Sequence, residues 1–381
     1  MFYLKFALNS YLKLKNILII PDKFKESLSS AEIIDLCVKA LNENYDNVKT
    51  FSYLISDGGD GFLDAIAHNK EEAIRIPVDS VNALGEPIQS EILVQGGTAF
   101  IEVAKSSGLQ QIPLKNRKPV HSSSYGTGLE LKKAIELGAK HIYIGLGGSA
   151  TNDGGIGMLG ALGFQFLDLN NKPLTPIAAN LIHIERIVVK EFTGIQFYGI
   201  CDVENPLLGK SGATSVYGPQ KGLHKNEVIA LEKGLNKLNQ VAENQLITSN
   251  QKTNIGAGAA GGIGYGLLTF LNAKLLKGGE FMIELNALDE LANSVNIDLV
   301  ITGEGHFDAQ SLQGKWVSHV IDFCKRHELS LLGFFGRISK DIDDFDYAYE
   351  IANPNWELER NMSDASDLLS LALKKALKNF R

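Results

Sequence analysis

Cysteine is scarce in this chain, which has three among its 381 residues: Cys37, Cys201 and Cys324. The three are widely spaced, and two of them have apolar neighbours at helical spacing. This pattern argues against a disulfide framework or a zinc site and predicts buried, reduced thiols in a cytoplasmic protein. A catalytic role for Cys201 is an alternative, although no histidine pattern accompanies it.

Long apolar runs are also missing. No run approaches the roughly 18 residues that a membrane-spanning helix needs, so we do not expect an integral membrane protein. The first fifteen residues, "MFYLKFALNSYLKLK", are apolar and basic, but lysines interrupt them and no small-residue cleavage site follows. We therefore expect residues 1–15 to be an N-terminal extension and not a signal peptide.

Positive charge is in deficit, because 37 Lys and Arg residues stand against 44 Asp and Glu residues, for a formal net charge of -7. Such a chain has no global field that would attract nucleic acid or an anionic membrane surface, and neither is an expected partner. Any cations that hold an anionic ligand must be local. The eight histidines lack metal-ligand spacing such as HExxH.

Alternating strand and helix patterns are present at both ends of the chain. The apolar run in "KNILIIPDKF" predicts a buried parallel strand, residues 29–44 a capped amphipathic helix, and residues 48–61 a second strand with its exit loop. Near the C-terminus, strands at 297–305 and 329–336 alternate with helices at 315–327 and 363–380. This alternation is typical of a doubly wound α/β fold.

The middle of the chain has a different pattern. Residues 74–80, 88–95 and 98–109 are successive strand-like runs with no helix between them, and a helix at 126–139 and strands at 140–148 and 195–206 follow. We therefore predict a flavodoxin-like doubly wound domain with a second, mixed α/β domain inserted into it. The expected boundaries place residues 16–64 and 286–381 in the flavodoxin-like domain and residues 65–285 in the insertion.

Several glycine-rich stretches could bind phosphate. "GAGAAG" at 256–261 fits GxGxxG but follows a polar segment instead of a strand, and "GKS" at 209–211 lacks the first glycine of a Walker A loop. The stretch "IGLGGSATNDGG" at 144–155 lies between a strand and a predicted helix, where backbone amides and the helix dipole favour an anion. A tight turn with Asn152 or Asp153 as the helix cap is about equally compatible with these residues.

Acidic residues follow the predicted strands. In doubly wound sheets ligands bind outside the carboxyl ends of the strands, so these acids could converge on one crevice and serve Mg²⁺ or a general base. Each one alone is more often a turn or cap residue. They are Asp22, Asp57, Asp60, Asp202 and Glu304.

Cations are interleaved with these acids, beside glycine-rich or strand-end segments where an acidic protein would hold phosphate. They are Lys23, Lys25, Lys221, Lys315 and Arg337.

Taken in order, the motifs of the chain resemble those of the glycerate kinase family, the type that phosphorylates D-glycerate with ATP. The resemblance covers residues 15–336. Asp60 stands where the family more often has Glu, and His306 where Arg is common. The matching motifs are "PDKFKESLS", "SDGGDG", "SSYGTG", "GLGGSATNDGGIGML", "CDVENPLLG", "YGPQKG", "GAGAAGGIG" and "VITGEGHFDAQSLQGK".

The resemblance implies a two-domain α/β protein with its site in the cleft between the domains, and it implies ATP, Mg²⁺ and D-glycerate as ligands. Lys315 and the 145–153 loop would hold the nucleotide phosphates, and Asp202 or Asp153 would orient Mg²⁺ or accept the hydroxyl proton. The expected nucleotide-binding residues also include Glu304. Within the loop they are Gly145, Gly147, Gly148, Ser149, Thr151 and Asn152.

Glycerate would be bound by a separate set of residues, with its carboxylate on Lys23, Lys25 or Arg337 and with Asp22 and Asp57 nearby. The 2-hydroxyl is the favoured acceptor, which would give 2-phosphoglycerate. Two alternatives are a kinase for a related small hydroxy acid, such as tartronate, and a non-catalytic regulator that binds a nucleotide or metabolite. The oligomeric state is open, and a homodimer is one option.

Overall fold

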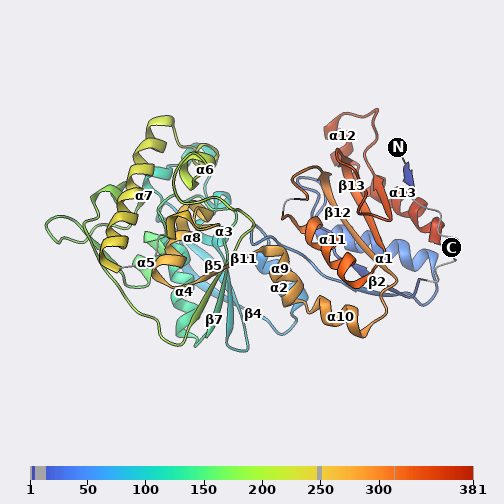
Figure 1. Ribbon diagram of the computed structural model, residues 1–381, viewed down its shortest axis with the longest axis horizontal. Helices are drawn as coiled ribbons and strands as arrows, with labels where there is room; N and C mark the ends of the chain where they lie inside the picture. The colour runs from blue at the N-terminus through green and yellow to red at the C-terminus, as the bar shows by residue number, and fades with distance from the viewer. Residues whose placement is uncertain (1, 5–13, 247–250, 313, 381) are drawn as a thin grey trace. The chain divides into compact units, whose positions relative to one another are not determined.

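The computed structural model describes residues 2–4, 14–246, 251–312 and 314–380, and the chain forms two compact units (Figure 1). Unit 1 consists of residues 1–56 and 279–381, and unit 2 of residues 57–278. The chain thus leaves unit 1, forms unit 2 and returns. Among the described residues, no helix is long and apolar enough to span a membrane.

Unit 1 is built on a six-stranded sheet in the order β1-β14-β13-β12-β2-β3. Five of its strands are parallel, and β1, within residues 1–15, pairs antiparallel with the edge strand β14. In chain order the parallel strands follow the sequence 2-1-3-4-5, the order of flavodoxin-like sheets. The strands are β1 (Phe2–Leu4), β2 (Asn16–Ile19), β3 (Lys49–Ser52), β12 (Leu299–Phe307), β13 (Leu331–Ile338) and β14 (Tyr347–Glu350).

The helices of unit 1 cover a sheet that is apolar on both faces. Ile17, Leu18 and Ile19 of β2 are all fully buried, as expected for a central parallel strand. Helix α1 starts at a capping box in which Ser29 and Glu32 satisfy each other's backbone amides. The helices are α1 (Ser30–Asn44), α9 (Gly278–Leu285), α10 (Leu288–Ser294), α11 (Trp316–His327), α12 (Leu358–Ser363) and α13 (Ala365–Leu377).

Unit 2 contains a mixed six-stranded sheet in the order β11-β10-β7-β6-β5-β4 and a separate β8-β9 pair. Strands β4, β5 and β6 form the predicted antiparallel meander, while β6, β7, β10 and β11 are parallel. The strands are β4 (Ile74–Val81), β5 (Pro87–Gln95), β6 (Thr98–Glu102), β7 (His141–Gly145), β8 (Gln165–Leu167), β9 (Arg186–Val188), β10 (Gln196–Ile200) and β11 (Lys274–Leu276).

One strand-like run, residues 98–109, changes structure within its length. The strand β6 ends at Glu102, and helix α3 follows at once. The carboxylate of Glu102 accepts the amides of Gly61 and Leu63 and so ties β6 to the start of α2. The helices of unit 2 are α2 (Phe62–Asn69), α3 (Val103–Ser107), α4 (Tyr125–Glu136), α5 (Ile156–Ala161), α6 (Ala213–Lys221), α7 (Lys225–Leu246) and α8 (Ala259–Phe270).

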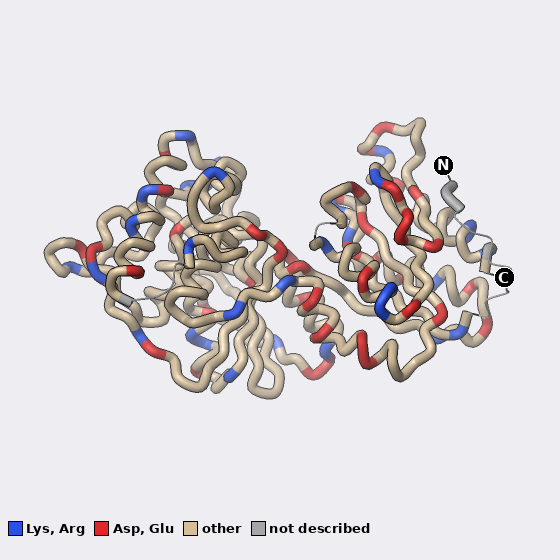
Figure 2. The backbone as a smooth tube through the Cα atoms, in the orientation of Figure 1, with Lys and Arg blue, Asp and Glu red and all other residues tan. Residues whose placement is uncertain are grey.

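Charge is distributed over both units. Figure 2 shows Lys and Arg scattered among Asp and Glu along the described part of the chain. The Lys and Arg residues of this negatively charged chain are therefore dispersed. What each of them can bind depends on its local partners.

Candidate active site

The glycine-rich loop after β7 packs against the loop at residues 57–61, which precedes α2. The amide of Gly147 donates to the carbonyl of Gly58 at 2.9 Å, and the amide of Leu146 donates to the carbonyl of Ile200 at 3.0 Å. A Cβ at Gly147 would overlap the Cα of Gly59. Glycine is required here because two backbones touch, whether or not a ligand binds.

The backbone amides of this loop differ in whether they have a hydrogen-bond acceptor. Those of Ala150, Asn152 and Gly154 donate to protein acceptors. Within the described residues, the amides of Gly148 and Ser149 have no acceptor. Gly148 has a φ of 70° and is exposed, so its amide is available to an anion.

Asp153 is fully buried between the starts of two helices. Its carboxylate accepts the amide and hydroxyl of Ser124, the N-cap of α4, at 2.7 and 2.8 Å, and the amides of Gly155 and Gly157 at 3.1 Å. Burial raises the pKa of this carboxyl, and the four donors oppose that shift. Helix α5 begins at Ile156 with Gly155 as its N-cap, so Asp153 acts on the helix from outside it.

Lys221, at the end of α6, lies beneath the glycine-rich loop and is 3% exposed. Its ammonium donates to the hydroxyl of Ser149 at 2.8 Å and to the carbonyl of Thr151 at 2.7 Å. Burial lowers the pKa of Lys221 to about 7. The sequence marked Lys221 only as one of several cations that could hold phosphate, through its place in the "YGPQKG" motif.

Asn152, a predicted nucleotide-binding residue, is also fully buried. Its side-chain amide donates to Thr214 at 2.8 Å, whereas its Oδ1 has no partner among the described residues. Asn152 thus connects the loop to α6.

Asp57 and Asp202 both adjoin Gly278. The amide of Gly278 donates to Oδ1 of Asp202 at 2.7 Å, and a Cβ on Gly278 would lie 2.7 Å from the backbone of Asp57. Asp57 Oδ1 accepts the amide of Gly59 at 2.9 Å. The structure therefore brings together two of the strand-end acids in unit 2, and neither is buried.

In unit 1, Asp22 follows β2, and Glu304 lies in the second half of the adjacent strand β12, where the strand order reverses. The amide of Asp22 donates to the carbonyl of Gly303 at 2.9 Å. In doubly wound sheets this switch point is where ligands bind.

Glu304 is 7% exposed, and its Oε1 has no hydrogen-bond partner within the described part of the chain. Burial raises its pKa to about 7, and the carboxylates of Asp22 and Asp308 add to the shift, whereas Ser311 and Lys315 oppose it. Glu304 can therefore exchange a proton near neutral pH.

The predicted cations of unit 1 are on the same edge of the sheet. Lys315 is the exposed N-cap of α11 and donates to Gln310 at 3.4 Å. Arg337 is exposed and stands opposite His306 in the β12–β13 register, and His306 bonds Ser339 at 2.8 Å. Lys25 is exposed and Lys23 half-buried in the loop after β2.

The carboxylates differ in how well they fit Mg²⁺. Within the described ranges, no group of three or more His, Cys, Asp or Glu residues could hold a metal ion. Protein-bound Mg²⁺ commonly uses only one or two carboxylates together with phosphate oxygens, and the accessible Asp202, with Asp57 beside it, fits that chemistry. Asp153 fits poorly because four donors already surround its carboxylate.

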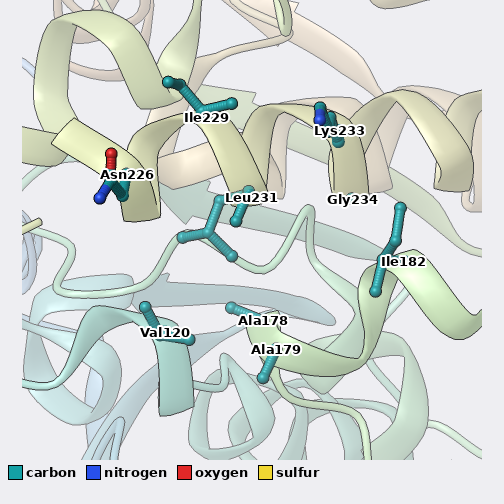
Figure 3. A pocket seen from close by; sticks show the side chains of 10 residues that line it. Val120, Ala178, Ala179, Ile182, Asn226, Ile229, Leu231, Lys233 and Gly234 are labelled. Atoms are coloured by element: carbon teal, nitrogen blue, oxygen red, sulfur yellow. The ribbon is translucent and has the colours of Figure 1, made fainter. Parts of the chain in front are cut away.

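A mainly apolar pocket of about 480 Å³ lies elsewhere in unit 2, between α7 and the 3₁₀ helix at 178–183. In Figure 3, Leu231 of α7 lies across the pocket from Ala178 and Val120. None of the predicted site residues lines it, so we do not assign it to the candidate site.

Sequence comparison finds relatives that match most of the chain. A sequence model of the glycerate kinase family matches residues 17–381. Glycerate kinase from Bacillus subtilis (strain 168) is 36% identical over 331 residues, which cover 85% of this chain and 86% of that protein. Glycerate 2-kinase from Escherichia coli (strain K12) is 36% identical over 332 residues, 86% of each chain.

A solved structure is similar over nearly the same range. The crystal structure of the Salmonella typhimurium LT2 protein described as glycerate kinase 2 has a TM-score of 0.84 and 31% identity, and the match covers 96% of this chain and 98% of that one. The similarity therefore extends through both units.

Proposed function

Because the chain belongs to the glycerate kinase family and is an enzyme, we propose that it transfers the γ-phosphoryl group of ATP to the 2-hydroxyl of D-glycerate. The products would be 2-phosphoglycerate and ADP. The observation that carries this proposal is the loop after β7, which combines an exposed amide without an acceptor at Gly148 with a buried cation, Lys221, that bonds Ser149. Such a loop suits phosphate oxygens.

Phosphate binding is assigned to the 145–151 loop and to Lys315. In phosphoryl transfer the protein contributes mainly positioning and charge neutralisation, because charge spreads over the transferred oxygens. The amides of Gly148 and Ser149 would position these oxygens. Lys315 is exposed and pairs only weakly with Gln310, so it can move to a ligand at little cost.

Mg²⁺ is assigned to Asp202, with Asp57 as its neighbour. When bound, the ion would neutralise charge on the phosphate oxygens. Asp153 instead has a positioning role in this proposal, since its carboxylate holds the starts of α4 and α5. It thereby fixes the far end of the phosphate loop.

Proton transfer is assigned to Glu304. A general base works best when its pKa is close to the operating pH, and that of Glu304 is raised to about 7. Its unpartnered Oε1 would accept the proton of the glycerate 2-hydroxyl as the hydroxyl oxygen attacks the γ-phosphorus and ADP leaves. Lys23, Lys25 and Arg337 are the candidates for the glycerate carboxylate, with Asp22 beside them.

A coupled assay of ADP release tests the proposal, with D-glycerate, L-glycerate, tartronate and hydroxypyruvate as acceptors and with Mg²⁺ present or chelated. We expect turnover with D-glycerate that requires Mg²⁺, and a phosphorus NMR spectrum of the product that identifies 2-phosphoglycerate. Preferred turnover of tartronate would favour the related hydroxy-acid kinase. ATP binding without turnover of any acceptor would favour a regulator.

We also propose that the enzyme is cytoplasmic. The three cysteines form no disulfide in the described chain, and two of them are buried. Burial raises the pKa of each thiol to about 12, which keeps it protonated and unreactive. These properties suit the reducing cytoplasm, and a homodimer remains part of the proposal.

A further inference from the structure

A carboxyl group that the proposed mechanism does not use lies inside unit 2. Glu130, on α4, is fully buried, and its Oε1 accepts the hydroxyl of Ser90 of β5 at 2.5 Å. Ser106 of α3 is near enough to affect the pKa of this carboxyl. No hydrogen bond from the described residues reaches the second oxygen, Oε2. Glu130 therefore meets α3 and β5 through hydroxyl groups.

The hydrogen bonds of Glu130 differ from those of the other buried acids of unit 2. Asp153 accepts three backbone amides and a hydroxyl, and Glu102 accepts two backbone amides. The hydroxyl of Ser90 can donate to a carboxylate or accept from a carboxylic acid, so it suits either form of Glu130. An ionised Glu130 would leave Oε2 charged, buried and without a donor in the described chain, which is costly. These contacts favour the neutral carboxyl.

Charged groups on the neighbouring elements add to this preference. Glu102, at the end of β6, raises the pKa of Glu130, whereas Lys105 of α3 lowers it. The ammonium of Lys105 is shared with two other acids, Glu91 of β5 at 3.1 Å and Asp64 of α2 at 3.9 Å. Burial has the largest effect, and the pKa of Glu130 is raised to about 8. The carboxyl is therefore protonated at neutral pH.

Helices α3 and α4 are joined by a buried polar cluster next to Glu130. Thr127, one turn earlier on α4, shares its hydroxyl with Ser106 at 3.3 Å and with Ser107 at 2.8 Å. All four side chains belong to fully buried residues. A cluster of this kind is stable only while its polar groups satisfy one another, so a charge on Glu130 would disturb the contact between the two helices.

The end of α3 is paired with the phosphate loop. The carbonyl of Ser107 accepts the amide of Ala150 at 2.8 Å, and the amide of Leu109 donates to the carbonyl of Gly148 at 2.9 Å. Residues 108 and 149 form an antiparallel bridge between these two bonds. The position of α3 therefore sets the position of the Gly148 amide, which is exposed and has no acceptor within the described residues.

We propose that Glu130 is a positioning residue whose neutral carboxyl holds α3 against α4 and thereby fixes the phosphate loop for ATP. Ionisation would place a second buried negative charge near Glu102 and weaken the support of the loop. ATP affinity should then fall at alkaline pH. This inference rests on the proposed function, because the ATP phosphates are the ligand assigned to that loop.

Calorimetric titration of ATP with Mg²⁺ at pH 7, 8 and 9 tests the proposal without turnover. The proteins are the full-length wild type, Glu130→Gln and the control Glu136→Gln, at an exposed position of the same helix. Glutamine has the shape of the neutral carboxyl and cannot ionise. We expect the ratio of the wild-type Kd to the Glu130→Gln Kd to rise at least threefold from pH 7 to pH 9.

This ratio cancels the titrations that both proteins share, including those of Lys221, Glu304 and ATP itself. The same ratio for Glu136→Gln should stay constant. A ratio for Glu130→Gln that is as constant as that of the control would overturn the proposal.

Steady-state kinetics give a second readout at pH 7. Glu130→Leu is close in size but removes the hydrogen-bonding oxygens, and circular dichroism establishes whether it folds. We expect its KM for ATP to rise at least tenfold while the KM for D-glycerate stays within twofold, and Glu130→Gln should restore the KM for ATP. A loss of stability alone would not change one KM selectively. An unchanged KM for ATP in the folded Glu130→Leu variant would also overturn the proposal.

The two measurements separate this inference from the proposed function. ATP affinity that depends on Glu130, in a protein that phosphorylates no hydroxy acid, would keep the positioning role and refute the proposed function. Phosphorylation of D-glycerate together with a constant Kd ratio would refute the positioning role and keep the proposed function.

Discussion

Asp153 and Asp202 carry the same side chain in opposite surroundings. Asp153 is fully buried, with four donors around its carboxylate, whereas Asp202 is partly exposed and accepts the amide of Gly278. Both follow glycine-rich or strand-end segments, and sequence spacing alone did not separate them. The carboxylate of Asp202 can reach a ligand, and that of Asp153 mainly holds the protein together.

Substitution of the two acids should therefore have opposite effects. We expect Asp202→Asn to reduce kcat by about 10²-fold or more with little change in Tm, because it removes charge from the proposed Mg²⁺ site. Asp153→Asn should reduce the free energy of unfolding by roughly 1–3 kcal/mol, since an amide cannot accept all four hydrogen bonds. Steady-state kinetics and urea unfolding measure the two effects.

Asp35→Asn is the matched control for both variants, because Asp35 is exposed on α1. It should change neither quantity. Unchanged turnover in Asp202→Asn, with the fold intact, would remove Asp202 from the site.

The carboxyl of Glu304 should make stability depend on pH. Its folded pKa of about 7 lies above the usual 4.5, so between these values the native state holds a proton that the unfolded chain has lost. The free energy of unfolding should therefore fall as pH rises from about 4.5 to 7 and level off above it. The whole effect is on the order of 3 kcal/mol, from the size of the pKa shift.

Glu304→Gln should remove this part of the pH dependence, and urea unfolding at half-unit steps between pH 5 and 8 measures it. Glu71→Gln, at an exposed position, provides the comparison. Parallel pH curves for wild type and Glu304→Gln would show that Glu304 titrates normally.

At the scale of elements, contacts between loops set the shape of the candidate site. Gly58 has a φ of 86°, and a Cβ there would overlap the backbone carbonyl of Ile200. Gly138, at the end of α4, has a φ of 84° and nothing within 4 Å of a Cβ. Comparison of Gly58 with Gly138 therefore separates the cost of a left-handed backbone from the cost of a steric overlap.

Gly138→Ala should therefore cost about 1–2 kcal/mol of unfolding free energy, the strain of a left-handed alanine. Gly58→Ala should cost at least about 2 kcal/mol more, because the loop at 57–61 must move away from β10. We also expect Gly58→Ala to raise the KM for ATP, which Gly138→Ala should leave unchanged. Equal losses of stability in the two variants would mean that the loop gives way easily.

At the scale of the whole molecule, each unit has its own sheet and core. One buried apolar cluster runs from Val78 to Ala273 in unit 2, and another joins the two chain segments of unit 1. An independent core is what allows a segment of this size to fold alone.

A fragment of residues 57–278 should consequently fold by itself. We expect far-UV circular dichroism of a mixed α/β protein and one cooperative urea transition, with no kinase activity because Glu304 and Lys315 are absent. The full chain measured under the same conditions is the reference. A fragment without a cooperative transition would show that the core of unit 2 depends on unit 1.

The sequence by itself determined the mixed α/β class, the three meander strands and the family. Each depends on local information: apolar runs become strands, periodic apolar residues become helices, and eight motifs in one order identify relatives. The predicted strand at 98–109 extended too far, because the change from β6 to α3 depends on contacts of Glu102 with another segment.

The site depended on tertiary structure. Only folding places Lys221 beneath a loop some seventy residues earlier and turns Asp153 toward two helix N-termini. Only folding also brings Asp57 and Asp202 close to Gly278 and buries Glu304 until its pKa is near neutral. Charge, burial and hydrogen bonding are properties of a side chain's neighbours, and these neighbours come from distant parts of the chain.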